Sequence, residues 1–101
     1  MRKGTTPTLV FTLDLETALL KSIYLTLQQG TLQVTKTGEE MRLLEDGCSV
    51  AVTLTQEETL QFVAGQFVSV QVRAVTQNGE AVATNILDVP MEAVLLDGVI
   101  T

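Results

Sequence analysis

Hydrophobic and polar residues alternate along much of this chain. In residues 50–55, two valines and a leucine at even positions alternate with an alanine and two threonines. Residues 68–73 repeat the pattern, with valine at even positions and serine, glutamine and arginine between them. A period of two places the apolar set on one face of a β-strand and the polar set on the other. The alternation therefore predicts two strands that each turn one face toward a core.

Similar alternation, interrupted by turn residues, predicts a chain built of short strands. Gln29-Gly30, Asp46-Gly47 and Asn78-Gly79 are the turn signals, and Asn-Gly favours a type I′ hairpin. Pro90 interrupts the pattern before the last strand. The expected strands are Thr8–Asp14, Ser22–Gln28, Thr31–Lys36, Met41–Leu44, Cys48–Leu54, Phe67–Val75, Ala81–Asp88 and Met91–Leu96.

This spacing predicts an all-β fold. Seven to eight short strands separated by frequent turns are typical of an antiparallel, immunoglobulin-like β-sandwich. The cysteines and tryptophan of true immunoglobulin domains are absent, since the chain has one cysteine and no tryptophan. At 101 residues, residues 1–101 are expected to form a single domain.

Two segments break the alternation and predict short helical turns. Thr55 and Glu58 fit a capping box, in which each side chain accepts from the backbone N–H of the other, so one helical turn is expected there. That role for Glu58 also argues against an acid/base pair with its neighbour Glu57. In the other segment, Asp14 is expected to cap a single turn, with leucines 19 and 20 folded beneath the sheets.

The predicted core is mainly aliphatic, because the chain has only four aromatic residues. It takes the apolar face of each strand together with the residues that follow the helical turn. Its members are Leu9, Phe11, Leu13, Ile23, Leu25, Leu27, Val50, Val52, Leu54, Leu60, Phe62, Val68, Val70 and Val72.

The charge of the chain argues against two classes of partner. The formal net charge is −6 and the isoelectric point is about 4.3. Such a chain repels nucleic-acid phosphates and anionic membrane surfaces, so neither partner is expected. The acidity itself has two interpretations, solubility alone or an acidic patch that faces a basic partner.

The residue types offer little catalytic chemistry. There is no histidine, so no metal cluster, no cofactor site and no enzymatic activity are expected. The single cysteine, Cys48, falls on the apolar side of its strand and is expected to be a buried, unreactive thiol. The N-terminal residues show no apolar signal region, and no apolar run has the length of a membrane span.

Several segments resemble small tail-region proteins in prophages of Gram-positive bacteria. The opening RKGTTPTLVFTL (residues 2–13) is also similar to the N-terminal domain of the baseplate upper protein family. Residues 50–62, 70–76 and 96–100 resemble the same small proteins. The resemblance implies a virion structural protein that is assembled in the bacterial cytoplasm and works at the tail or baseplate, without catalytic residues. The C-terminal part of the baseplate upper protein has no counterpart here, which leaves an adaptor or assembly module.

A protein of this kind is expected to act through contacts with other tail or baseplate proteins, or with copies of itself. Edge strands offer unpaired backbone groups as templates for a partner strand. The candidate partner-binding residues are those of the polar lead-in, which is expected to extend away from the domain: Gly4, Thr5, Thr6, Pro7 and Thr8. The alternative is a carbohydrate- or host-surface-binding module, for which Tyr24 is the one aromatic that alternates away from its apolar neighbours.

Overall fold

The computed structural model describes all 101 residues and consists mostly of strands. One short helix, α1 (Gln56–Leu60), and two 3₁₀ turns, η1 (Thr17–Leu19) and η2 (Gly38–Glu40), interrupt them. The strands are β1 (Thr8–Thr12), β2 (Leu20–Gln29), β3 (Leu32–Thr37), β4 (Met41–Leu43), β5 (Ser49–Thr53), β6 (Phe67–Thr76), β7 (Ala81–Ala83) and β8 (Leu87–Pro90).

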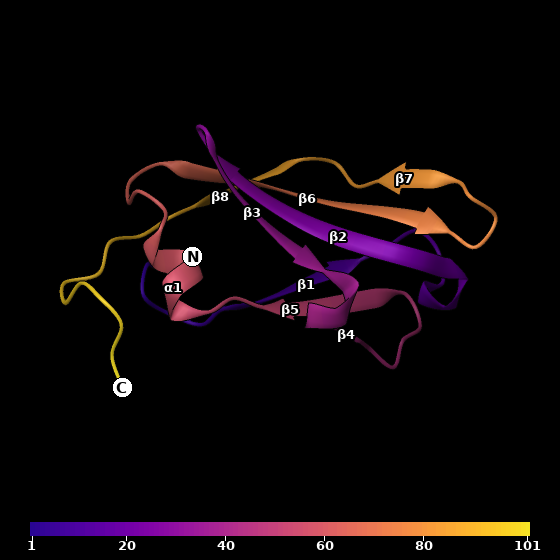
Figure 1. Ribbon diagram of the computed structural model, residues 1–101, viewed down its shortest axis with the longest axis horizontal. Helices are drawn as coiled ribbons and strands as arrows, with labels where there is room; N and C mark the ends of the chain where they lie inside the picture. Colours follow the sequence, from indigo (N-terminus) through magenta and orange to yellow (C-terminus); the bar gives the residue numbers. More distant parts are fainter.

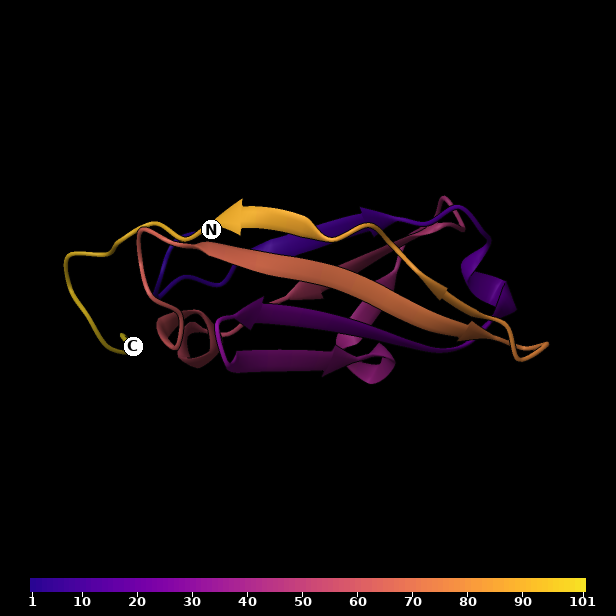
Figure 2. The ribbon, with the colours of Figure 1, turned by 90° about the horizontal axis from the view of Figure 1, so that it is seen from above.

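The eight strands form two antiparallel sheets, as the all-β prediction required. The smaller sheet has the order β1-β5-β4, and the larger has the order β3-β2-β6, with both β7 and β8 paired to β6. Figure 1 shows the smaller sheet on one side of the molecule and the larger sheet on the other. Helix α1 and both chain ends lie at one end of the long axis, and β7 lies toward the other end (Figures 1 and 2).

The core draws on both sheets and confirms most of the predicted set. The predicted residues of β2, β5 and β6 are buried, as are Leu54 and Phe62. The predicted residues of β1 are only half-buried against the core, because β1 is an edge strand with no neighbour on its outer side. Leu60 is also only partly buried, whereas Met91, which was not predicted, is 1% exposed.

The predicted capping box is present at the start of α1. The Thr55 hydroxyl accepts from the Glu58 N–H at 3.1 Å, and the Glu58 carboxylate accepts from the Thr55 N–H at 2.8 Å. Thr59 is fully buried and donates its hydroxyl to the carbonyl oxygens of Thr5 and Gln56. The helix is thus fixed at its N-terminus by its own sequence and along its side by the N-terminal segment.

Three sequence predictions are wrong: two concern strands, and one concerns the burial of Leu19. Residues 91–96 form no strand; Glu92 makes only an isolated bridge with Arg2. The single strand expected over 81–88 is divided into β7 and β8, because the Thr84 hydroxyl accepts from the Val72 N–H and the chain bulges there. Leu19 is 51% exposed rather than folded beneath the sheets, and no side chain caps η1.

Two of the predicted turns differ in detail from the structure. Gln29 pairs with Leu32, so the two-residue turn is Gly30-Thr31, with only Gly30 at positive φ. At the predicted Asn78-Gly79 turn only Gly79 has positive φ, and Thr76 donates its N–H to the Glu80 oxygen. A three-residue loop that ends in a left-handed glycine therefore replaces the expected type I′ turn.

Replacing Gly79 with valine is expected to destabilise the domain by about 1 kcal/mol. The residue has φ of 86°, and no atom lies within 4 Å of an added Cβ, so backbone strain alone sets the effect. Gly79→Asn is the matched control and should cost less, because asparagine tolerates the left-handed region better. Urea unfolding measures both changes, and equal losses would contradict the assignment.

Candidate functional site

The predicted partner-binding residues lie against the domain instead of extending from it. The chain is held by backbone bonds from Lys3 N–H to the Glu92 oxygen and from Glu92 N–H to the Met1 oxygen. Because these bonds hold residues 1–3 against the domain, the lead-in does not extend into solvent as expected. The backbone of residues 1–3 is therefore already used as a strand partner within the chain.

Each of the five predicted residues has a definite place. The Thr5 oxygen accepts from the Thr59 hydroxyl, and the Pro7 oxygen accepts from the Leu54 N–H at 3.0 Å. Gly4, with φ of 73°, lies near Leu60 and Val94. Three of the five are exposed, namely Thr5, Thr6 and Thr8, and the Thr8 hydroxyl bonds to that of Thr53 at 2.8 Å. Their role in partner binding stays a prediction, and the adjoining strand β1 offers the more open surface.

Strand β1 has one edge without a strand partner. The bonds from Leu54 N–H to the Pro7 oxygen and from Leu13 N–H to the Cys48 oxygen flank its ladder with β5. Antiparallel bonding alternates, so residues 7, 9, 11 and 13 face β5 with their backbone groups. The N–H and C=O groups of Val10 and Thr12 therefore point to the open edge. That edge can accept one more strand.

An apolar groove lies beside this edge. It encloses about 700 Å³ between the end of β1 with the residues that follow it and the β7–β8 segment. Phe11 and Leu13 contribute to one wall, Val82 and Leu87 to the other, and Val72 of β6 also lines it. Asp14 is the only charged residue of the lining. The edge and the groove together can bind an extended peptide whose backbone pairs with β1 and whose apolar side chains enter the groove.

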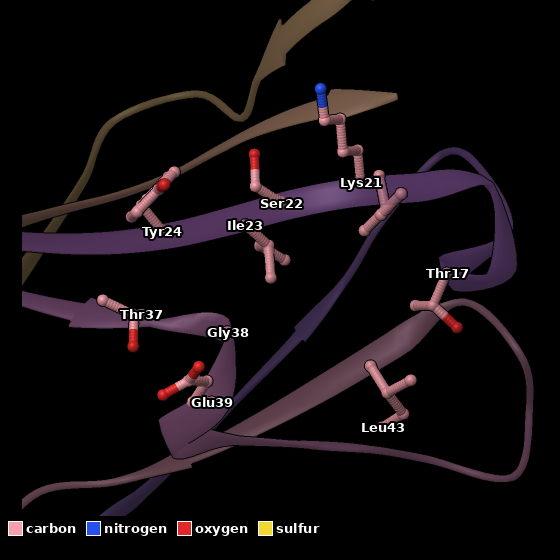
Figure 3. Close-up of a pocket in the computed structure, with 10 residues that line it drawn as sticks. Thr17, Lys21, Ser22, Ile23, Tyr24, Thr37, Gly38, Glu39 and Leu43 are labelled. Atoms are coloured by element: carbon pink, nitrogen blue, oxygen red, sulfur yellow. The ribbon is translucent and has the colours of Figure 1, made fainter. Parts of the chain in front are cut away.

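A second pocket of about 550 Å³, with fewer hydrophobic residues in its lining, lies between β2, η2 and β4. Figure 3 shows Ile23 and Leu43 extending into the space between β2 and β4, whereas Ser22 and Tyr24 point to the other side of β2. Tyr24, the aromatic singled out from the sequence, is 44% exposed. The lining also includes Lys21 and Glu39, but the side chains of Tyr24 and Lys21 point to the side of β2 opposite Ile23, away from the pocket (Figure 3).

A partly buried ion cluster connects β3 to α1 and η2. The Lys36 ammonium lies 2.9 Å from both carboxylate oxygens of Glu58 and 2.9 Å from Glu40. Only 6% of Lys36 is exposed. Sequence reasoning missed this cluster, although Lys36 follows Leu32 and Val34 on the inward face of β3 by the same period of two.

The pKa shifts in this cluster follow from its hydrogen bonds. Burial by itself would lower the pKa of Lys36, but the bonds to Glu58 and Glu40 outweigh burial and raise it. Burial would raise the pKa of Glu58, but the bonds from Lys36 and from the Thr55 N–H lower it. The bond from Lys36 also lowers the pKa of Glu40. Glu58 is thus committed to the helix cap and the ion pair, and Glu57 does not share either role.

Cys48 is only half-buried, so the prediction of a buried thiol is wrong. It lies in the loop before β5, which begins one residue later than expected, at Ser49. Asp46 organises this loop by accepting from the N–H groups of Cys48 and Ser49 and from the Ser49 hydroxyl. The Ser49 hydroxyl and the Cys48 N–H lower the pKa of the Asp46 carboxyl.

The structure contains no group of three or more cysteine, aspartate or glutamate side chains that could hold a metal ion, and the chain has no histidine. None of the helices has both the length and the apolar character needed to cross a bilayer. Comparison of the chain with protein-family models, with curated proteins and with solved structures found no match.

Proposed function

We propose that this protein is a non-enzymatic structural module that works through protein–protein contacts, with the open edge of β1 as its main contact surface. The single observation that carries the proposal is the unpaired β1 backbone at Val10 and Thr12 beside an apolar groove. Unpaired edge groups and adjacent apolar surface together favour addition of a partner strand. The net charge of −6 disfavours nucleic-acid and anionic membrane partners.

The proposed architecture is a β-sandwich of immunoglobulin-like size. The shared core supports it, because apolar residues of β2 and β6 in the larger sheet pack with those of β5 in the smaller one. The strand order differs in one place from a constant-type immunoglobulin domain: β2 belongs to the sheet of β3 and β6, not to that of β1, β4 and β5. The proposal therefore concerns the packing of two sheets and not the immunoglobulin strand order.

The proposed location is the phage or prophage virion, where the protein is an adaptor or assembly module at the tail or baseplate. This part rests on the resemblance of residues 2–13 and of the later segments to small prophage tail proteins. Its partners are then other tail or baseplate proteins, and assembly takes place in the bacterial cytoplasm. Many weak strand contacts suit such a structure, because linked copies bind together with high avidity.

Affinity capture from phage-producing cells tests the proposal. We expect the tagged protein to capture tail or baseplate proteins and Val10→Pro to lose most of that capture, because proline removes an outward backbone donor and blocks strand addition. The matched control is Val63→Asp, which changes a valine that is 54% exposed on another surface. Equal capture by both variants, at matched melting temperatures, would contradict the role of β1.

One observation favours a second function, the binding of a carbohydrate. Tyr24 presents a ring that is 44% exposed on the side of β2 to which Lys21 also points (Figure 3), and stacking on an aromatic ring combined with polar contacts is a common way to hold a small polar ligand. NMR titration with bacterial cell-wall saccharides distinguishes the two functions. Selective shifts around Tyr24 would favour the carbohydrate function.

A further inference from the structure

The segment 94–101 carries large apolar side chains that the domain leaves uncovered. Leu95 is fully exposed, Leu96 is 70% exposed and Ile100 is 57% exposed. Figure 2 shows the segment at the end of the molecule, beyond the sheets. Exposed apolar side chains gathered in one short segment are typical of a contact surface.

The backbone of this segment is hydrogen-bonded to the rest of the domain at one residue only, Ile100. Its hydrogen bonds to the rest of the domain are two: the Gln56 side-chain amide donates to the Ile100 oxygen at 3.0 Å, and the Ile100 N–H donates to the Gln56 amide oxygen at 2.8 Å. These are the two bonds that one residue exchanges with its partner in an antiparallel ladder. The Gln56 side chain thus occupies the position that a neighbouring strand would take.

The order of residues in the segment fits the groove beside β1. Gly98 has φ of 95° in this structure, so pairing as a strand requires the segment to straighten there. In the straightened segment Val94, Leu96 and Ile100 lie on one face, whereas Leu95, Asp97 and Val99 lie on the other. The first face is entirely apolar and matches the mainly apolar lining of the groove. The negative charge of Asp97 falls on the opposite face, away from Asp14.

We infer that residues 94–100 of one copy add as a strand to the open edge of β1 in a second copy, with Leu96 and Ile100 in the groove. The inference rests on the proposed function, because it names the occupant of the same surface. The molecule is 46 Å long, and the segment lies at one end of it, whereas β7 and the residues that follow β1 lie toward the other end (Figure 2). Contact between them is therefore head to tail, which produces rings or open chains.

Sedimentation of the full chain over a range of concentrations tests the inference. We expect species larger than a monomer, and we expect Leu96→Asp to weaken their formation by about tenfold or more, because the charge would enter the groove. The matched control is Leu95→Asp, which adds the same charge one residue earlier on the opposite face. It should leave the association unchanged.

Mixing two defective variants tests the head-to-tail arrangement directly. Val10→Pro removes the accepting edge and keeps the donor segment, whereas Leu96→Asp removes the donor and keeps the edge. Each variant alone should be monomeric, and an equal mixture should form heterodimers, because each pair retains one intact donor and one intact edge. Melting temperatures close to that of the parent chain establish that both variants are folded.

Three results would overturn the inference: a parent chain that stays monomeric, equal weakening by Leu95→Asp and Leu96→Asp, or a mixture that fails to associate. Capture of tail proteins that is lost in Val10→Pro, with a monomeric parent chain, would overturn the inference and leave the proposed function standing. If Val10→Pro keeps both the self-association and the capture of tail proteins, the proposed function and the inference are both contradicted.

Discussion

Replacing Val70 with aspartate is expected to destabilise the domain by about 4 kcal/mol or more, which is a large part of the stability of a domain of this size. Val70 is 1% exposed on the central strand β6, where it is paired with Leu27 on one side and Leu87 on the other. A carboxylate there would have no partner and would lose its hydration. Thermal unfolding followed by circular dichroism should show a partly or fully unfolded protein at room temperature.

The control for this prediction is the same substitution at an exposed valine. Val63→Asp places the carboxylate at a residue that is 54% exposed, and it should change the free energy of unfolding by less than about 0.5 kcal/mol. A variant Val70→Asp that melts within a degree or two of the parent chain would show that the assignment of the inward face of β6 is wrong.

The second large effect is expected for Lys36→Met. Removing the ammonium leaves the Glu58 carboxylate, whose side chain is 19% exposed, without the cation that offsets its burial. Loss of one partner of a buried ion pair costs about 3 kcal/mol, and partial solvent access to Glu58 places the expected loss at roughly 2 to 3 kcal/mol. Lys21→Met is the matched control, because that lysine is exposed on β2, and it should have little effect.

A double variant distinguishes the effect of the unpaired Glu58 carboxylate from the effect of lost Lys36 packing. In Lys36→Met with Glu58→Gln the glutamine oxygen can still accept from the Thr55 N–H, so the helix cap is kept while the uncompensated charge is gone. We expect it to recover about half of the loss or more. If the double variant is as unstable as Lys36→Met alone, the loss of stability comes from packing of the lysine side chain and not from the unpaired Glu58 carboxylate.

The pH dependence of Lys36→Met follows from the directions of the pKa shifts. The pKa of Glu58 is lowered on folding, so its contribution is present above its ordinary value of 4.5 and is lost as the pH falls through the folded value. The pKa of Lys36 is raised, so its contribution is present below 10.5 and is lost only as the pH rises above that value. The difference in stability between the parent chain and Lys36→Met should therefore be constant between these values and decrease below pH 4.5. A difference that persists in acid would contradict the ion-pair explanation.

The alternation of residues predicted best the strands that have a paired strand on each side, such as β5 and β6. The predicted inward residues of 50–54 and 68–72 are all buried, whereas Ser69 and Gln71 on the outer face of β6 are half-buried. Ala51 is also buried, on the outer face of β5 between its neighbours Val10 and Arg42. The capping box at Thr55 is equally local and is present as predicted. Alternation fails at residues 91–96, where apolar residues continue but the chain forms only the isolated bridge between Arg2 and Glu92.

The candidate site depended on features that no single segment contains. The open edge of β1 exists because β5 occupies one side of it and no strand occupies the other. Burial of Lys36 was implicit in the alternation of β3, but the carboxylates that make it tolerable come from α1 and η2. The half-exposed position of Cys48 reflects the Asp46 loop, which shifts the start of β5 by one residue.

The sequence by itself determined the period of the strands, most of the inward faces, the helix cap and the acidic charge, because each depends on neighbours within a few residues. The tertiary structure alone decided which strands became edges, that the N-terminal lead-in folds back onto residues 90–92, and where the groove beside β1 opens. Those outcomes depend on pairing between segments distant in the chain. Several pairings satisfy the same alternation of residues, and only the packing of the two sheets around a common core selects one of them.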